Sequence, residues 1–291
     1  MTGMRQVTSG LQFPEGPISM DDGSVLVVEI EGGNLTRVDP DGRTTVVAHC
    51  GGGPNGAALG PDGSVYVAND GGLAFMTEDE IRFPYALADD NTGGQVQRVD
   101  LATGAFEDVY TESGGERLGG LNDVVFDDGG WFYLVDTGRG AIHYAHPDGS
   151  AMRPVADGLE VPNGMGVSPD GRRLYVSETY TGRLFAWDVA DDGELQDRVL
   201  LYTADGHGWD GLAVDGAGNV CIANLQHSGV SIISPEGALK EEVTVPLHDP
   251  YVTNVCFGGP DGRTAFICSS GRGLLYAVEW PYPGLRLHFA R

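Results

Sequence analysis

The chain has 291 residues, of which 41% are hydrophobic and only 20% charged, and its 46 glycines predict dense turns rather than long amphipathic helices. The 42 acidic residues outnumber the 17 basic ones and give a formal net charge of −25 at pH 7. Such a charge repels phosphate backbones and anionic lipid headgroups, which excludes nucleic acids and membrane surfaces as partners and favours a small-molecule substrate.

The sequence predicts a cytoplasmic protein with one domain over residues 1–291. No stretch approaches the roughly 20 apolar residues of a membrane span. The N-terminus lacks the charged-then-apolar order of a signal peptide. All-β barrels and propellers of this length commonly form one domain. The sequence does not indicate an oligomeric state.

Six segments along the chain share one pattern, which is a polar anchor residue, a short apolar run, an Asp-Gly type turn and a second β-rich run. In chain order, the anchors are Glu15, Asn55, Asn122, Asn163, Asp210 and Asn254. They are separated by 40, 67, 41, 47 and 44 residues, and a period of about 40–45 residues is typical of a four-stranded propeller blade. The sequence therefore predicts an all-β, six-bladed propeller with four-stranded blades around a central metal site.

The long spacing between Asn55 and Asn122 indicates an insertion between Asp70 and Gly94, after the second run of blade two. It should emerge beside the anchors, where loops normally set substrate selectivity. Its apolar residues have two possible roles, an apolar wall that binds substrate or packing of the loop onto its own blade. They are Phe75, Met76, Phe83 and Tyr85.

The ring of blades must close, because a blade cannot bury both of its faces alone. The fourth strand of the last blade comes either from the N-terminal residues before Leu11, which we favour, or from the segment Leu285–Phe289. Both segments alternate apolar with polar residues, so the sequence does not decide between them.

The innermost strand of each blade lines the central channel, so the six anchors should converge there. Two carboxylates and four carboxamides are unusual in a core unless they are paired or coordinate a cation. The alternative is local, since Asn and Asp also cap turns at the starts of strands. Six positions in register, one of them a glutamate, favour the shared site. Ligands that offer only oxygen favour Ca²⁺ first, with Mg²⁺, Mn²⁺ or Zn²⁺ as alternatives.

A second polar register follows the anchors by fourteen residues, where the second run ends. If the first two strands form a hairpin, these residues return to the level of the anchors and support them, or they serve as turn residues. They are Glu29, Asn69, Asp136, Ser177 with Glu178 next to it, Asn224 and Cys268.

Four of the motifs resemble the gluconolactonase-like family, which includes senescence marker protein (regucalcin), calcium-dependent lactonases and diisopropyl fluorophosphatase. The resemblance covers nearly the whole chain. It rests on Phe13-Pro-Glu-Gly-Pro, Leu121-Asn-Asp, Val161-Pro-Asn-Gly-Met-Gly and Trp209-Asp-Gly-Leu, and on their order and spacing.

The resemblance implies that Glu15, Asn163 and Asp210 bind the metal and that Asp210 is also the catalytic base. It implies that Asn122 is a fourth ligand or a substrate contact, with Asp123 beside it. The family often has an arginine two residues before this asparagine to hold a polyol, whereas this chain has Gly120. A preference for sugar lactones is therefore not implied.

The resemblance further implies a metal-dependent lactonase, in which the metal polarises the lactone carbonyl and Asp210 assists the attack of water or attacks directly. Two alternatives keep the same site. One is a phosphotriesterase or fluorophosphatase, and the other is a non-catalytic calcium-binding propeller. His207 lies just before Asp210 and is a candidate substrate contact alongside Phe75, Phe83 and Tyr85, or it is a surface residue.

Overall fold

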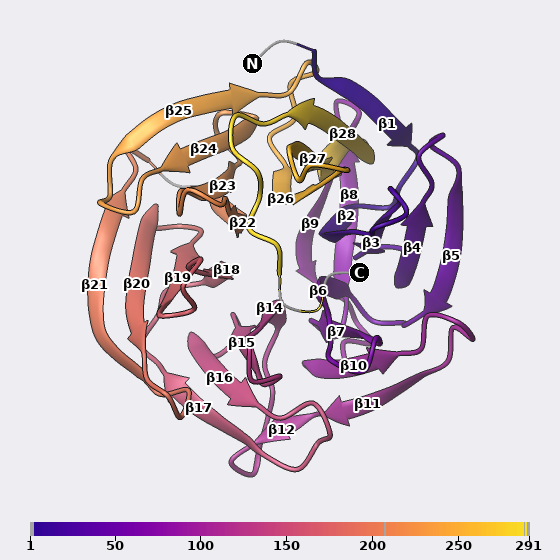
Figure 1. The fold of residues 1–291 in the computed structure, drawn as a ribbon. Coiled ribbons are helices and arrows are strands. Elements are labelled where there is room, and N and C mark those ends of the chain that lie inside the picture. The colour runs from indigo at the N-terminus through magenta and orange to yellow at the C-terminus, as the bar shows by residue number, and fades with distance from the viewer. Residues whose placement is uncertain (1–2, 207, 288, 290–291) are drawn as a thin grey trace.

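The structure, a computed structural model, describes residues 3–206, 208–287 and 289. Six four-stranded antiparallel sheets stand around one axis as the blades of a propeller (Figure 1). The predicted all-β, six-bladed architecture is therefore confirmed. Within the described ranges, no helix is long and apolar enough to cross a membrane.

Each blade is a meander in which consecutive strands pair from the axis outwards, apart from the last strand of blade six. Blade one contains β2 (Pro14–Ser19), β3 (Val25–Glu29), β4 (Asn34–Val38) and β5 (Thr44–His49). Blade two contains β6 (Pro54–Leu59), β7 (Val65–Asn69), β10 (Gln95–Val99) and β11 (Phe106–Tyr110). Blade three contains β14 (Leu121–Phe126), β15 (Phe132–Asp136), β16 (Ala141–Ala145) and β17 (Met152–Ala156). Blade four contains β18 (Pro162–Val167), β19 (Arg173–Glu178), β20 (Arg183–Val189) and β21 (Leu195–Thr203). Blade five contains β22 (Trp209–Val214), β23 (Val220–Asn224), β24 (Gly229–Ile233) and β25 (Leu239–Thr244). Blade six contains β26 (Val252–Gly258), β27 (Thr264–Ser269), β28 (Leu274–Glu279) and β1 (Arg5–Ser9).

Burial falls from the second strand of a blade to its outer strand. Every residue of β15 is buried, whereas β25 is exposed at all positions but one. The second strands are continuous apolar runs because neighbouring blades cover both of their faces. Between blades two and three, for example, Tyr66, Phe126 and Phe132 pack in one cluster. This packing between blades provides the core of the ring.

The recurring Asp-Gly segments close the hairpins between the first and second strands. The carboxylate of Asp22 accepts the backbone N–H of Ser24 at 3.0 Å, which is the Asx-turn bond that favours Asp at such positions. The same bond to the residue two positions on recurs at Asp62, Asp170, Asp215 and Asp261. The repeated Asp-Gly motif thus forms the turn at the end of each inner strand that lies opposite the anchor.

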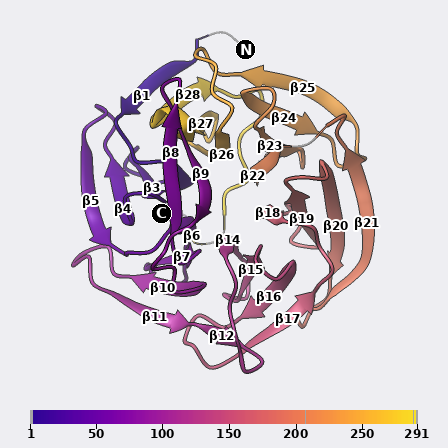
Figure 2. The ribbon, with the colours of Figure 1, turned by 180° about the vertical axis from the view of Figure 1, so that it is seen from behind.

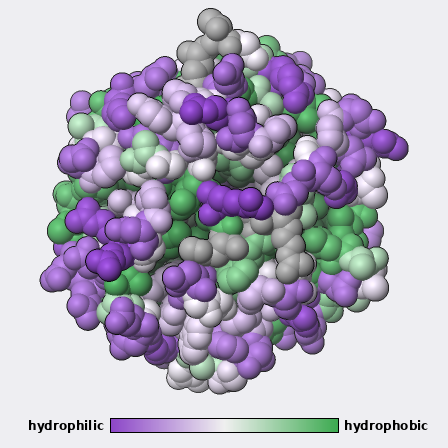
Figure 3. Space-filling view, in the orientation of Figure 1, coloured by the Kyte–Doolittle hydropathy of each residue, from purple (hydrophilic) through white to green (hydrophobic). Residues whose placement is uncertain are grey.

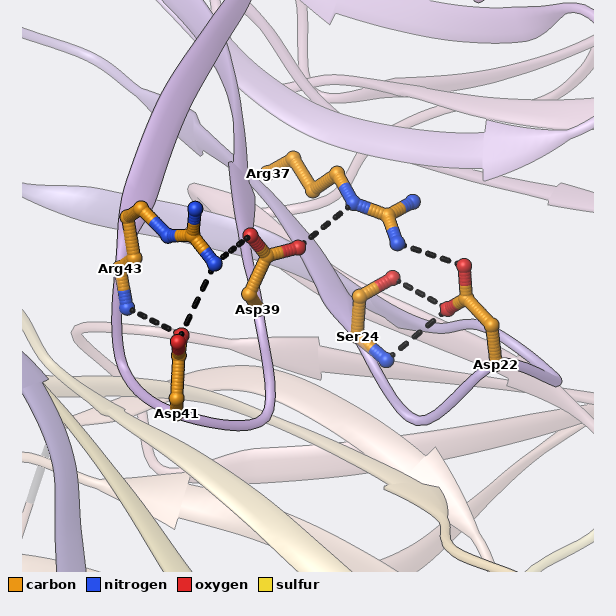
Figure 4. Close-up of polar contacts among 6 residues, drawn as sticks. All are labelled: Asp22, Ser24, Arg37, Asp39, Asp41 and Arg43. Carbon is orange, nitrogen blue, oxygen red and sulfur yellow. Dashed lines mark hydrogen bonds and ion pairs between the residues drawn. The ribbon is translucent and has the colours of Figure 1, made fainter.

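In blade one, ion pairs also connect this turn to the next hairpin (Figure 4). Arg37 lies between Asp22 and Asp39 and forms an ion pair with each. Hydrogen bonds from Arg37 lower the pKa of Asp22 to about 2. Because these groups are largely solvated, the contacts contribute to turn geometry more than to stability.

The N-terminal strand closes the ring. β1 pairs antiparallel with β28, with Arg5 opposite Ala277, so the N-terminal alternative is correct. The other candidate, Leu285–Phe289, belongs instead to a tail that crosses the axis on one face of the ring (Figure 1). On this face, hydrophilic residues cover most of the rim, and hydrophobic residues reach the surface beside the tail (Figure 3).

The tail is held by backbone bonds and by apolar contacts to several blades. The N–H of Leu285 donates to the carbonyl of Val214 at 3.0 Å, and the ring of Phe289 meets that of Phe126 edge-on at 5.8 Å. Leu285 packs against the clusters of blades three to five, and Phe289 against those of blades one to three.

We therefore expect deletion of residues 284–291 to lower the free energy of unfolding by about 2 kcal/mol, since two partly buried apolar side chains are lost. Urea denaturation would measure the loss. A matched control removes only residues 290 and 291 and should retain full stability. Equal stability of the two truncated proteins would show that the tail does not stabilise the ring.

The predicted insertion in blade two forms a second hairpin, β8 (Leu73–Glu78) and β9 (Ile81–Leu87), which lies on the face opposite the tail (Figure 2). A short hairpin, β12 (Glu112–Ser113) and β13 (Glu116–Arg117), accounts for the rest of the long spacing between Asn55 and Asn122. The sequence predicted the first insertion but not the second.

Candidate functional site

The anchors stand at the starts of the inner strands β2, β6, β14, β18, β22 and β26, which contact one another in sequence around the ring. The glycines that follow several anchors allow this close approach. A Cβ atom at Gly164 would lie 2.6 Å from the Cα of Gly211 on the next blade, and one at Gly211 would collide with the amide of Asn254. The Asn-Gly and Asp-Gly pairs of the anchors are therefore required by packing at the axis.

Glu15 and Asn254 are directly bonded, although 239 residues separate them. The side-chain amide of Asn254 donates to Oε2 of Glu15 at 2.6 Å, and the N–H of Gly16 donates to the same oxygen at 2.8 Å. Burial raises the pKa of Glu15, against hydrogen bonds from Thr253 and Asn254 that lower it. Asn254 thus orients the carboxylate that we predict as a metal ligand.

Asp210 and Asn163 lie side by side on blades five and four. Burial raises the pKa of Asp210 well above its usual range, and the nearby Glu15 carboxylate raises it further. The amide nitrogen of Asn163 donates to Oγ1 of Thr179 at 3.1 Å, while its carbonyl oxygen is buried without a partner among the described residues. An unpartnered buried carbonyl oxygen is costly, and a water or a cation bound there would satisfy it.

Asp123 connects two blades. Its Oδ1 accepts the N–H of Val124 and its Oδ2 the N–H of Met165 on blade four, both at 2.8 Å. Burial raises the pKa of Asp123 to about 7, and Glu15 adds a smaller upward contribution. Asn122 next to it is only partly buried, and its side chain makes no hydrogen bond with the part of the chain that the structure describes.

A divalent cation fits the chemistry of this donor set. Glu15 is buried and interacts with the partly buried carboxylate of Asp210, and the carbonyl oxygen of Asn163 beside them lacks a donor among the described residues. In the described ranges no three His, Cys, Asp or Glu side chains gather as a metal site. A site of two carboxylates and one amide oxygen contains only two side chains of these types, so it is not a group of that kind. Hard cations accept such oxygen ligands.

The hairpin β8–β9 crosses from blade two over blades one and six. Phe75 packs against Phe13 with ring centroids 5.2 Å apart, and Phe83 stacks on Tyr251 at 5.8 Å with a 4° angle between the rings. Nε of Arg82 also binds both carboxylate oxygens of Glu31 on blade one, at 3.0 and 2.9 Å.

The rings of Phe75 and Phe83 therefore pack on blades one and six, at residues just before the anchors Glu15 and Asn254. Tyr85 is 62% exposed and makes no ring contact among the described residues. His207 lies outside the described residues.

The second polar register supports the loops that lead into the anchors. Oε2 of Glu29 accepts the N–H of Gln12, and Oδ1 of Asn69 accepts that of Gly53. Asp136 and Glu178 do the same for Gly119 and Glu160. Ser177 instead bonds the carbonyl of Asp210 at 2.8 Å, which joins blade four to the predicted base. The supporting role thus holds for these five residues, whereas Asn224 takes the turn role and accepts the N–H groups of Gln226 and His227.

Two residues at the site were not predicted from the sequence. Thr179 bonds Asn163, and Asp70 accepts a hydrogen bond from the side-chain amide of Asn55 at 3.3 Å. Both come directly after a second strand, Asp70 one position beyond its register residue Asn69 and Thr179 two positions beyond Ser177.

A cavity of about 860 Å³ occupies the channel on the other side of the anchors, between Asp123 and the tail residues Leu285 and Leu287. Its walls are mainly the apolar residues of the inner strands, such as Ile18 and Leu212. The cavity lies on the side of the anchors that the tail crosses, whereas the hairpin β8–β9 lies on the opposite face of the ring (Figure 2).

Comparison with known proteins gives a match over most of the chain. Residues 13–271 match the family model described as "SMP-30/Gluconolactonase/LRE-like region". A protein named lactonase drp35, from Staphylococcus haemolyticus, is 28% identical over 82% of this chain and 71% of its own length. The diisopropyl-fluorophosphatase of Loligo vulgaris is 26% identical over 96% of this chain and 92% of its own length.

Solved structures agree on the fold. The structure of a gluconolactonase from Xanthomonas campestris superimposes with a TM-score of 0.78, covering 96% of this chain and 89% of its own, at 21% identity.

Proposed function

The chain belongs to the SMP-30/gluconolactonase/LRE-like family, and on that premise we propose that it hydrolyses a lactone at a divalent cation held by Glu15, Asn163 and Asp210. The observation that carries the proposal is the buried carbonyl oxygen of Asn163, which lacks a partner among the described residues and lies beside the interacting carboxylates of Asp210 and Glu15. Ca²⁺ is the first choice, and Asn122 is the fourth ligand or a substrate contact.

The groups at the site would have the following roles in the hydrolysis. A bound cation supplies a Lewis acid that polarises the lactone carbonyl and stabilises the negative charge that develops on its oxygen. Asp210 accepts a proton from the water that attacks the carbonyl carbon. As the bond between that carbon and the ring oxygen breaks, the proton passes to the ring oxygen and a hydroxy acid leaves.

The surrounding side chains position these groups. Asn254 holds the carboxylate of Glu15, and Ser177 holds the backbone of Asp210. Asp123 fixes blade three to blade four next to Asn122. Phe75, Phe83 and Tyr85 on the hairpin β8–β9 would contact the part of the substrate that extends out of the channel. His207, three residues before Asp210 in the sequence and outside the described residues, is proposed for the same role.

The test is hydrolysis of a panel of aliphatic, aromatic and sugar lactones by protein prepared with Ca²⁺ and by the same protein after treatment with EDTA. We expect EDTA to lower kcat/KM by at least about 100-fold, because a Lewis acid contributes several kcal/mol, and Ca²⁺ in excess of EDTA to restore it. Hydrolysis that is insensitive to EDTA would contradict the metal site.

A second candidate reaction is cleavage of a phosphotriester or fluorophosphate at the same site. The relative named diisopropyl-fluorophosphatase, which is matched over 96% of this chain, favours it. Paraoxon and diisopropyl fluorophosphate therefore belong in the same panel. If calcium binds but no lactone or phosphotriester is turned over, the propeller binds calcium without catalysing either reaction.

A further inference from the structure

The residue that follows the second strand of each blade lies at the level of the anchors. In blades one to five the last residue of that strand pairs with the residue just before the anchor, as Asn69 does with Pro54 and Asp136 does with Leu121. In blade six Ser269 pairs with Val252, two residues before the anchor. The next residue therefore reaches the ring of anchors. In chain order, these six residues are Ile30, Asp70, Thr137, Thr179, Leu225 and Ser270.

Contacts confirm this placement in three blades. The amide of Asn163 donates to Thr179, and the amide of Asn55 donates to Asp70. The hydroxyl of Ser270 lies 2.5 Å from that of Thr253, next to the last anchor. Together with the anchors, these side chains surround the mouth of the channel.

Asp70 is the one carboxylate among the six equivalent residues. It is 6% exposed, with Oδ1 accepting the N–H of Gly72 at 2.7 Å and Oδ2 accepting the amide of Asn55. No ion pair involves it within the described ranges. Burial raises its pKa to about 7. The other blades fold with a hydroxyl or an aliphatic side chain at this position, so blade formation does not require the costly carboxylate.

An open space lies beside Asp70, between blades two and three. A Cβ atom at Gly120 would meet nothing within 4 Å except the Cβ of Asp70, at 4.0 Å. Gly53 is different, because a Cβ there would collide with the carboxylate. The free position at Gly120 therefore lies beside the Cβ of Asp70, and Asn122 follows it by two residues in the chain.

We propose that Asp70 determines substrate specificity by binding, together with Asn55, an ammonium group of the substrate, which makes amino lactones the substrate class. The inference rests on the proposed lactonase function. An ammonium ion supplies the positive partner that this carboxylate lacks, and bonds to charged groups are among the strong ones. The net charge of −25 further attracts a cationic substrate and repels the carboxylate of an unsubstituted product.

The test compares α-amino-γ-butyrolactone with γ-butyrolactone, which has the same ring without the ammonium group. We expect the wild-type protein with Ca²⁺ to prefer the amino lactone in kcat/KM by at least about 10-fold, the value of one charge-assisted hydrogen bond. Asp70→Asn and Asp70→Thr should lower that ratio by about 10-fold to 100-fold. Threonine is the residue that blades three and four carry at this position, so the second variant retains a side chain that the fold accepts.

Asp89→Asn is the matched control, because Asp89 is exposed in the same insertion and its loss changes the net charge equally. It should keep the ratio of the wild-type protein. A ratio near one for the wild type, or an equal loss on both lactones in the Asp70 variants, would overturn the inference and leave the lactonase function in place.

A binding measurement separates the inference from the proposed function. The lactams 3-aminopyrrolidin-2-one and pyrrolidin-2-one resist hydrolysis, and calorimetric titration gives their affinities without turnover. If the wild-type protein hydrolyses no lactone, the proposed function fails. Tighter binding of the amino lactam, lost in Asp70→Asn, would then still support the ammonium site, and equal affinities would overturn it.

Discussion

Replacing Asp210 with asparagine should lower kcat for lactone hydrolysis by at least about 1,000-fold, within the range for loss of a general base. The substitution keeps the shape of the side chain and the acceptor for the N–H of Gly211, which lies 3.0 Å from Oδ1. It removes the negative charge that holds the cation and the oxygen that accepts the proton. Both losses act on the chemical step, so kcat falls more than KM rises.

Folding of the Asp210→Asn protein should be intact. Burial and Glu15 raise the pKa of Asp210 in the cation-free protein, so a neutral amide is tolerated there. Circular dichroism and thermal unfolding in EDTA would check this. Asp261→Asn serves as the control, since it removes one charge from an exposed turn, keeps an Asx acceptor, and should retain full activity. Activity of Asp210→Asn within 10-fold of the wild type would exclude Asp210 as the base.

The sequence was sufficient to predict the ring because local turn chemistry and periodicity specify it. The Asx bond of Asp22 repeats in other blades, and the register of each hairpin places the anchor at the start of the inner strand. The close approach of Gly164 to the next blade explains why the anchors carry following glycines. The Asx turns and the hairpin register are visible in one chain because they depend on residues close together in sequence, and the glycines are visible because they recur in the repeat.

The partners of the anchors were not predictable, because they depend on contacts over long distances in sequence. Asn254 bonds Glu15 only after the ring has closed. The path of the hairpin β8–β9 depends on Phe83 meeting Tyr251 and on Arg82 meeting Glu31, which belong to blades six and one. Strand alternation carries no information on such contacts.

The position of Asp70 shows the same limit. In the sequence it follows Asn69 as an ordinary turn residue, and its character comes from burial between two blades. Closure of the ring by β1 was equally open, since the segment Leu285–Phe289 has the same alternation. The pairing of Arg5–Ser9 with the edge of β28 shows which segment closes the ring.

Glu15→Gln should change stability in opposite directions with and without calcium. In EDTA the variant should be more stable than the wild type by about 1–3 kcal/mol at about pH 8, because a buried charge without a cation is replaced by an amide. In excess Ca²⁺ the wild type should be the more stable protein, since a ligand at 100 times its Kd adds about 2.7 kcal/mol and the variant binds it poorly.

The pH dependence follows from the raised pKa of Glu15. A carboxyl whose pKa is raised in the folded state stabilises the protein while it is protonated. That stability is lost as the pH rises from 4.5, the pKa of the carboxyl in the unfolded chain, through its higher pKa in the folded protein. The advantage of Glu15→Gln in EDTA should therefore be small near pH 4.5 and grow towards about pH 8. Asn254 donates to an oxygen that glutamine retains, so the bond between blades one and six is kept. Lower melting temperatures of the variant both in EDTA and in Ca²⁺ would mean that the charge of Glu15 serves the fold, because only a cation site makes its removal favourable in one condition and harmful in the other.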